Sequence, residues 1–369
     1  MAKKLGFGLM RVPEKNGNID VEEVKKMVDL FMERGFTYFD TAWMYCNMRS
    51  EDTVKEALSS RHPRDSYTLA TKLHSEFFNT LEERDKVFNE QLRKTGAGFF
   101  DYYLIHDVNS HSIGKYDRLD VWTWIQEKKK AGLIREAGFS FHDGPELLDR
   151  VLTEHPEMEF VQLQINYLDW NSVGVQSRKC YDVATKHGKP VTVMEPVKGG
   201  TLAQLPPEAE KLLKDYAPDA SIPSWAIRFA ASLPNVRFVL SGMSNMAQVD
   251  DNTAYMQEMK LLTEEEKALI FRAVSILNGT IAIPCTACSY CVDGCPMQIP
   301  IPRYFSLYNA ELQEVESKGW TPQREYYDNI SKEKGKASDC IACGQCEGIC
   351  PQHLPIIKHL KEVAGLFEG

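Results

Sequence analysis

The stretch VEEVKKMVDLFMERGFTYFD, residues 21–40, contains the unit from which the fold is predicted. Its first part, up to Gly35, spaces apolar residues three and four apart, as an amphipathic helix does, and closes on glycine, a common helix stop. Its second part, residues 36–40, is a short apolar run with aromatic residues, which favours a buried strand. The stretch therefore predicts a helix followed directly by a strand.

This unit recurs through the first 257 residues. Helical patterns also cover residues 80–96 and 118–132, and both end on Gly. Eight strand-like runs alternate with such patterns: LGFGLM (5–10), FTYFD (36–40), YTLAT (67–71), DYYLIH (101–106), IREAGF (134–139), FVQLQ (160–164), PVTVM (190–194) and RFVLS (237–241). Strands and helices in that number over roughly 250 residues predict an α/β fold of the (β/α)8 TIM barrel type. A doubly wound sheet is the alternative, but no G-x-G-x-x-G motif follows any run.

The composition excludes several classes of function. With 43 Lys and Arg against 52 Asp and Glu, the formal net charge is -9, whereas nucleic-acid partners attract basic surfaces. No run approaches the ~18 consecutive apolar residues of a membrane span, and the opening MAKKLGFGLMRVP lacks the apolar core of a signal peptide. We therefore expect a cytoplasmic protein with neither nucleic acid nor membrane as partner. Its ten cysteines then indicate metal or redox use rather than disulfides.

The character of the chain changes after Met259. Residues 261–280 contain one more predicted helix, which Thr263 and Glu266 open as a capping box. Residues 281–369 hold eight of the ten cysteines and show little strand alternation. The predicted organisation is therefore a barrel over residues 1–260, a connecting helix over 261–280, and a small, mostly α-helical iron–sulfur domain over 281–369.

The iron–sulfur prediction rests on two cysteine runs with one spacing. CTACSYCVDGCP (285–296) and CIACGQCEGICP (340–351) both read C-x2-C-x2-C-x3-C-P. This spacing is typical of ferredoxin clusters, and in two-cluster ferredoxins the fourth cysteine ligates the other cluster. Zinc is the alternative, but structural zinc sites usually pair two C-x2-C units across a longer gap. The runs predict two [4Fe-4S] clusters, one held by Cys285, Cys288, Cys291 and Cys350 and the other by Cys340, Cys343, Cys346 and Cys295.

Polar residues lie at or just after the ends of three predicted strands, on the face where barrel enzymes build their sites. Asp40 and Tyr45 follow the second strand, Lys72 the third and His106 the fourth. A tyrosine can protonate a carbonyl oxygen, and a lysine beside it would lower its ordinary pKa of about 10. Asp40 would keep Lys72 charged, and His106 would donate a hydrogen bond to the substrate oxygen. Taken singly, each residue is more often a cap, a wall or a rim residue.

These residues and several motifs resemble the aldo/keto reductase superfamily. The motifs, in family order, are FDTAWMY (39–45), LATK (69–72), YLIH (103–106), AGFS (137–140), LQIN (163–166) and LSGMSNMAQVDDN (240–252). The cysteine runs are similar to those of the branch with a C-terminal ferredoxin-like extension. The resemblance implies an oxidoreductase that reduces a carbonyl, or oxidises an alcohol, by hydride transfer from NAD(P)H. Its catalytic residues would be Asp40, Tyr45, Lys72 and His106, with Tyr45 as the general acid.

The resemblance also implies a cofactor site. Ser140 and Gln164 stand where the family binds the nicotinamide amide, although Phe141 replaces the asparagine that usually shares this task. A loop that can approach a phosphate contains Lys198, Gly199 and Gly200. After the eighth strand, NADPH-dependent members place Lys or Arg for the 2′-phosphate. Here no cation is evident, and the residues are Ser244, Asn245, Gln248 and Asn252. FMN is therefore the alternative to NAD(P)H.

Clusters carry one electron at a time whereas nicotinamide delivers two together, and a flavin is the usual group that couples the two. Three functions stay open. The first, the family default, is an NAD(P)H-dependent carbonyl reductase whose clusters are structural or serve a partner. The second is a flavin- or ferredoxin-linked oxidoreductase, in which the clusters pass single electrons from a ferredoxin- or flavoprotein-type partner to the barrel. The third is an electron-transfer protein with an idle barrel, against which the presence of Asp40, Tyr45, Lys72 and His106 argues.

Overall fold

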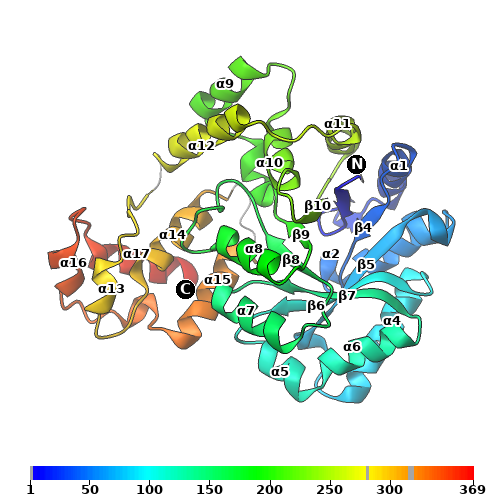
Figure 1. Cartoon of the computed structure of the whole chain (residues 1–369), viewed down its shortest axis with the longest axis horizontal. Coiled ribbons are helices and arrows are strands. Elements are labelled where there is room, and N and C mark those ends of the chain that lie inside the picture. The colour runs from blue at the N-terminus through cyan, green and yellow to red at the C-terminus, as the bar shows by residue number, and fades with distance from the viewer. Residues whose placement is uncertain (1–2, 280–281, 315–319) are drawn as a thin grey trace.

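The computed structural model describes residues 3–279, 282–314 and 320–369. Its centre is a closed barrel of parallel strands in the order β1-β10-β9-β8-β7-β6-β5-β4 (Figure 1). Every predicted run overlaps one of them, so the predicted TIM barrel is confirmed. The strands are β1 (Leu5–Gly8), β4 (Tyr38–Asp40), β5 (Thr68–His74), β6 (Phe100–Val108), β7 (Ile134–Phe141), β8 (Phe160–Gln164), β9 (Val191–Met194) and β10 (Val236–Ser241). A separate small hairpin pairs β2 (Glu14–Lys15) with β3 (Asn18–Ile19).

At least one helix follows each barrel strand and covers the outside of the barrel (Figure 1). Residue signals set their ends: the Thr80 side chain caps the start of α4, and Gly96, at φ 63°, ends it in the left-handed region. The helices are α1 (Val21–Glu33), α2 (Tyr45–Met48), α3 (Ser50–Val54), α4 (Leu81–Thr95), α5 (Ile113–Arg118), α6 (Val121–Lys130), α7 (Pro145–Glu154), α8 (Ser177–Lys186), α9 (Pro207–Tyr216), α10 (Ile222–Ala231) and α11 (Met246–Gln257). Short turns complete the connections: η1 (Lys55–Ser59), η2 (Arg64–Ser66), η3 (Ser75–Phe77) and η4 (Lys198–Ala203).

Strand alternation divides the barrel core into two layers. Side chains such as Phe7, Phe39 and Tyr103 belong to the large cluster between the strands and the helices. Their sequence neighbours point the other way, and a second cluster fills the inside of the barrel with Tyr38, Ala70, Tyr102, Leu104, Phe160 and Leu240. Two residues further along the same faces come Asp40, Lys72 and His106. The apolar interior therefore ends in a polar layer at the carboxyl ends of the strands.

The C-terminal part begins with α12 (Glu264–Asn278), which the Thr263–Glu266 capping box opens as predicted. The rest is small and helical in its described residues, and it has its own apolar core, which includes Ile301, Tyr304, Phe305, Tyr327 and Val363. Residues 280 and 281, where the predicted domain boundary falls, lie outside the described residues. The elements are α13 (Tyr290–Asp293), α14 (Ile301–Leu312), α15 (Pro322–Glu333), η5 (Ala337–Asp339), α16 (Gln345–Ile349) and α17 (Ile356–Phe367).

Helix α15 packs against the barrel at the carboxyl end of β7. The Asn329 side chain donates a hydrogen bond to the His142 carbonyl at 3.1 Å. The rings of Trp320 and Tyr326 lie 6.1 and 6.2 Å from the His142 ring. The helical region thus covers part of the barrel mouth, while α13 and α16 lie at its far end (Figure 1). No helix among the described residues is long and apolar enough to cross a membrane.

Candidate active site and cluster sites

The structure brings Asp40, Tyr45, Lys72 and His106 together at the barrel mouth. Lys72 Nζ donates to Asp40 Oδ1 at 2.5 Å and to the Thr41 carbonyl at 2.8 Å. The same Nζ lies 4.8 Å from the centre of the Tyr45 ring. The Tyr45 ring in turn lies 5.9 Å from the His106 ring, nearly edge-on. Segments that are distant in sequence thus place a carboxylate, an ammonium, a phenol and an imidazole around one point.

Burial and neighbouring charges set the protonation of this group. Burial alone would lower the pKa of Lys72, but the charges and hydrogen bonds of Asp40 and Tyr45 raise it above its usual value, so the ammonium is charged. Burial also lowers the pKa of His106 well below its usual value, and His74, Lys72 and His142 add to this effect. His106 is therefore neutral near pH 7 and has one N–H to donate.

The expectation that Lys72 lowers the pKa of Tyr45 was wrong in its net direction. Loss of contact with water raises the pKa of the Tyr45 phenol above 10. The charge of Lys72 and the hydrogen bond between Lys72 and Tyr45 act in the opposite direction but are outweighed. The phenol is thus protonated over the physiological range. A proton donor needs this state at rest, and the nearby ammonium stabilises the phenolate that forms once the proton has left.

The turn that carries Tyr45 has an unusual backbone. Cys46, Asn47 and Met48 have φ of 52°, 54° and 63°, in the left-handed region that residues other than glycine rarely occupy. Conformations of this kind cost about 1–3 kcal/mol each and persist only where the surroundings hold them. The Cys46 thiol lies 3.3 Å from the Met10 carbonyl, and burial raises the pKa of the thiol. Cys46 therefore lines the wall of the site and does not act as a nucleophile.

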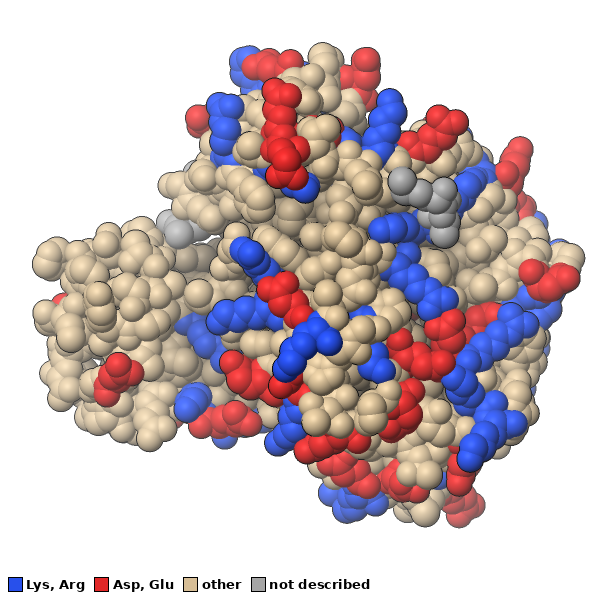
Figure 2. Space-filling model, in the orientation of Figure 1, with Lys and Arg blue, Asp and Glu red and all other residues tan. Residues whose placement is uncertain are grey.

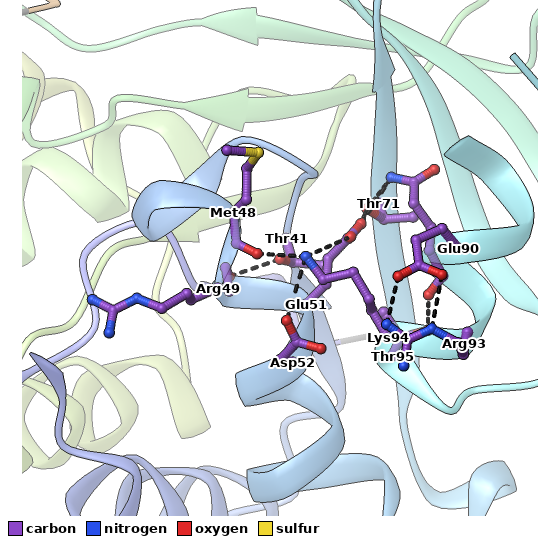
Figure 3. Close-up of polar contacts among 12 residues, drawn as sticks. Thr41, Met48, Arg49, Glu51, Asp52, Thr71, Glu90, Arg93, Lys94 and Thr95 are labelled. Atoms are coloured by element: carbon purple, nitrogen blue, oxygen red, sulfur yellow. Dashed lines mark hydrogen bonds and ion pairs between the residues drawn. The ribbon is translucent and has the colours of Figure 1, made fainter. Parts of the chain in front are cut away.

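Lys94, from α4, holds this turn in place. Figure 3 shows its ammonium reaching the Met48 carbonyl, with Asp52 at 3.4 Å and Glu51 at 3.9 Å. Glu51 is fully buried and accepts hydrogen bonds from Thr71 at 2.7 Å and from Gln91 at 2.8 Å. This network ties the Tyr45 turn to β5, which carries Lys72. This network could not be predicted from the sequence, where Lys94 is an ordinary basic residue near a helix end.

The residues expected at the nicotinamide are buried near the same mouth. Ser140 Oγ accepts from the Asp107 amide at 2.8 Å, which leaves its hydroxyl hydrogen free to donate. Gln164 Nε2 donates to Asp169 at 3.0 Å, and its Oε1 is buried without a partner among the described residues. A carboxamide has one acceptor oxygen and a donor NH2, so these two groups fit the amide of a nicotinamide.

The loop expected at a phosphate is already surrounded by carboxylates. Lys198 is buried and donates to both oxygens of Asp169, at 2.8 and 2.9 Å. The Gly199 amide donates to Glu195 at 2.7 Å. Gly200 has φ 108°, which only glycine adopts readily, and a side chain there would meet nothing within 4 Å. The loop is therefore shaped to come close to a ligand, but its cation and one amide are paired within the chain.

Glu314, which follows α14, lies against this loop. Its carboxylate is so close to Gly199 that any side chain at position 199 would require the carboxylate to move. Burial raises the pKa of Glu314 to about 7; Lys198 opposes the rise, while Glu195 and Asp169 add to it. The C-terminal region therefore places an acid that changes charge near neutral pH beside the candidate phosphate loop.

The positions after β10 form a separate group around Arg11. Ser244 Oγ donates to the Arg11 carbonyl at 2.7 Å, while Asn245 caps α11 by accepting from the Gln248 amide at 3.0 Å. Asn252 is buried and donates to Ser241 at 2.9 Å, which fits a structural contact. Arg11 lies over Gly242, near Gly199, and 3.8 Å from Glu195. Arg11, from the loop after β1, therefore provides a cation near these positions, where none was evident from the sequence.

The eight cysteines of the two runs fall into the two sets that the spacing predicts. One cavity is lined by Cys285, Cys288, Cys291 and Cys350, and the other by Cys295, Cys340, Cys343 and Cys346. Ile301 lines both, so the cavities are neighbours in one apolar surround. Among the described residues, no three Cys, His, Asp or Glu side chains converge closely enough to hold a single metal ion. Each set surrounds a space instead, and four thiolates around a space suit a four-iron cluster.

Comparisons with known proteins match both parts of the chain. The family model described as "Aldo/keto reductase family" matches residues 4–273, and the one described as "4Fe-4S dicluster domain" matches residues 284–354. The uncharacterised oxidoreductase YqkF of Bacillus subtilis is 23% identical over 301 residues, covering 72% of this chain and 91% of YqkF. L-galactose dehydrogenase of Arabidopsis thaliana is 24% identical over 287 residues, covering 72% and 88%. The solved holo form of aldo-keto reductase AKR11C1 from Bacillus halodurans has a TM-score of 0.61 and 25% identity, covering 73% of this chain and 91% of that one.

Proposed function

The chain belongs to the aldo/keto reductase family of oxidoreductases and carries a 4Fe-4S dicluster domain, and on that premise we propose that it reduces the carbonyl group of a small molecule with NAD(P)H. The observation that carries the proposal is the assembled group of Asp40, Lys72, Tyr45 and His106, in which Lys72 bonds Asp40 at 2.5 Å and lies 4.8 Å from the Tyr45 ring. In reverse, the same group would oxidise an alcohol.

Each residue has one task in this proposal. Neutral His106 donates its N–H to the carbonyl oxygen and orients it. Tyr45 donates its phenolic proton to the same oxygen as negative charge develops there, and solvent later restores that proton. Lys72 stabilises the phenolate left behind, and Asp40 keeps Lys72 charged and in place. Because all of this happens in a buried layer, the charges act with little screening by water.

Nicotinamide, when bound, supplies the hydride for the carbonyl carbon. Ser140 and the unpartnered Gln164 Oε1 would hold its amide, and Lys198, Gly199, Gly200 and Arg11 would lie toward its phosphates. The family norm supports NAD(P)H, and nothing among the comparisons points to FMN. The cysteine sets would hold the two [4Fe-4S] clusters, and Ile301 and its apolar neighbours would shield them from water.

A second candidate is an oxidoreductase whose clusters pass single electrons to the barrel site. This candidate is favoured by the carboxylates around the phosphate loop, because the negative charges of Asp169, Glu195 and Glu314 would repel the pyrophosphate of a dinucleotide. The contact of α15 with His142 also gives the cluster region a place beside the site. An electron-transfer protein with a catalytically inactive barrel is disfavoured, because burying the charged Lys72 costs free energy, from which a barrel without a reaction would gain nothing.

The test uses protein purified without oxygen, with its clusters, and NADPH in which both hydrogens at C4 are replaced by deuterium. A panel of aldehydes and ketones is screened, and products are analysed by mass spectrometry. Direct transfer predicts deuterium on the carbinol carbon of the product. Products without deuterium on that carbon would instead favour single-electron delivery. A Cys343→Ser variant that still folds separates the candidates further: the proposed reductase retains turnover, whereas an enzyme supplied through its clusters loses it.

A further inference from the structure

The cluster region exposes apolar side chains where its cysteines reach the surface. The three most exposed large hydrophobic residues among those the structure describes are Ile341, Tyr290 and Ile349, at 61, 60 and 55%. Tyr290 lies between Cys288 and Cys291, Ile341 follows Cys340, and Ile349 precedes Cys350. Cys288 and Cys343 are themselves exposed. Because helices α13 and α16 pack against each other, Tyr290 and Ile349 come from neighbouring elements.

Within the two cysteine runs the charge has one sign, while the exposed Lys336 and Lys358 lie just outside them. Residues 282–302 contain Asp293 as their one charged side chain, and residues 337–357 contain Asp339 and Glu347 but neither Lys nor Arg. Figure 2 shows the contrast on the visible face: the barrel carries blue and red side chains side by side, while the cluster region is nearly uncharged. The patch is therefore apolar at its centre, with acidic groups and no basic ones in its cysteine runs.

Exposed apolar groups of this kind mark a surface that another molecule covers for part of the time. Redox proteins meet through small, transient interfaces, and complementary charge around such an interface speeds their encounter. We propose that the face formed by Tyr290, Ile341, Ile349 and Asp293 is the docking surface for a one-electron carrier protein, whose own docking face presents Lys and Arg around an apolar centre. The inference does not depend on the carbonyl chemistry, because it concerns the far end of the helical region and not the residues at the barrel mouth.

The step at this face is a single electron transfer. A reduced carrier would supply the electron that a bound cluster accepts and would itself become oxidised, and an oxidised carrier of the same class would take that electron back. No covalent bond forms or breaks and no proton moves. The side chains at the face therefore have one task, which is to hold the two redox groups close for a short time.

The probe is ferricytochrome c, a basic haem protein that accepts one electron. Binding is measured by calorimetry with both proteins oxidised, so that no electron moves. The second-order rate of haem reduction is then measured by stopped flow, using the cluster-loaded full chain reduced beforehand with dithionite. Both are recorded from low to high salt. The variants are Asp293→Lys and Tyr290→Ser, neither of which lines a cluster cavity, and the matched control is Glu208→Lys, exposed on α9.

We expect Asp293→Lys to lower the affinity and the rate constant about three- to tenfold at low salt, with the difference lost near 0.5 M salt. Tyr290→Ser should lower both at every salt concentration, and Glu208→Lys should change them less than about twofold. Iron content and the spectra of the reduced clusters must match the unaltered protein. Equal effects of Asp293→Lys and Glu208→Lys would mean unspecific attraction to the net charge of -9, and would overturn the proposal. A dimer that Tyr290→Ser dissociates would also overturn it, because a second copy would then cover the face.

Discussion

The barrel mouth and the cluster region belong to one chain but treat their reactive groups in opposite ways. At the mouth, Lys72 is fully buried and bonded to Asp40. In the cluster region, Cys288 and Cys343 are exposed beside apolar side chains. Proton transfer to a carbonyl benefits from a dry site in which fixed charges act strongly. Electron exchange with another protein requires a redox group near the surface. The difference indicates two kinds of chemistry in separate places.

The largest effect should come from removing the phenol at the mouth. Tyr45→Phe keeps the ring but loses the proton donor, so we expect kcat for carbonyl reduction to fall about 10²- to 10⁴-fold. The measurement is steady-state kinetics with a substrate found in the deuterium screen. Tyr290→Phe is the matched control, since it makes the same change in the cluster region and should leave kcat unaltered. Near-normal turnover of Tyr45→Phe would remove the proposed acid.

The next effect is on stability and contrasts a buried ion pair with an exposed one. Lys72→Met leaves Asp40 buried without its cation, which should lower the free energy of unfolding by about 3–5 kcal/mol. The pair of Lys211 and Asp215, at 2.6 Å, is largely exposed, and Lys211→Met should cost less than about 1 kcal/mol. Urea unfolding of the two variants measures the difference. Adding Asp40→Asn to Lys72→Met should recover part of the loss, because the uncompensated charge is removed.

A smaller effect concerns pH and the acid that the C-terminal region places on the barrel. Because the pKa of Glu314 is raised to about 7, its carboxyl is mostly neutral at pH 6 and mostly ionised at pH 8. An ionised Glu314 repels a phosphate, so the affinity for NADH should fall as pH rises, by about three- to tenfold between pH 6 and pH 8. NADH is the right probe, since its phosphates stay ionised throughout.

Glu314→Gln should flatten this pH profile, because its side chain is neutral at both ends of the range. Fluorescence titration of NADH at several pH values measures the affinity, and Glu208→Gln serves as the control. Lys198, Glu195, Asp169 and Arg11 also face the loop. A profile that Glu314→Gln leaves unchanged would contradict the role of this carboxyl. Failure of every variant to bind NADH at any pH would instead count against the nicotinamide proposal.

Much of this arrangement could be predicted from local sequence. The strand runs predict the barrel, and they bring Lys72 and His106 to its mouth, although β5 and β6 each continue two residues beyond these positions. The paired cysteine sets follow from the spacing together with the arrangement of two-cluster ferredoxins, in which the fourth cysteine of each run ligates the other cluster. What the sequence could not show depends on packing between distant segments. Arg11 becomes a neighbour of Gly199 only when the barrel closes, and Glu314 only when the helical region docks.

The expected direction of the Tyr45 pKa shift was wrong for a related reason. A neighbouring lysine can be predicted from two strand ends, but the depth at which the phenol is buried cannot, and burial proves the larger influence. The left-handed turn at Cys46, Asn47 and Met48 was likewise missed, since none of these residues is glycine. Its support by Lys94 depends on how α4 packs beneath the turn.

The most direct test of the separation between the two regions is an absorption spectrum of the protein purified without oxygen, recorded before and after addition of NADPH. The proposed reductase keeps hydride at the barrel mouth and exchanges cluster electrons at the far face. It therefore predicts a visible cluster band that NADPH leaves unchanged, and no flavin peaks. Bleaching of the cluster band on mixing, or flavin peaks in the starting spectrum, would contradict that separation and show that the two regions form one electron path.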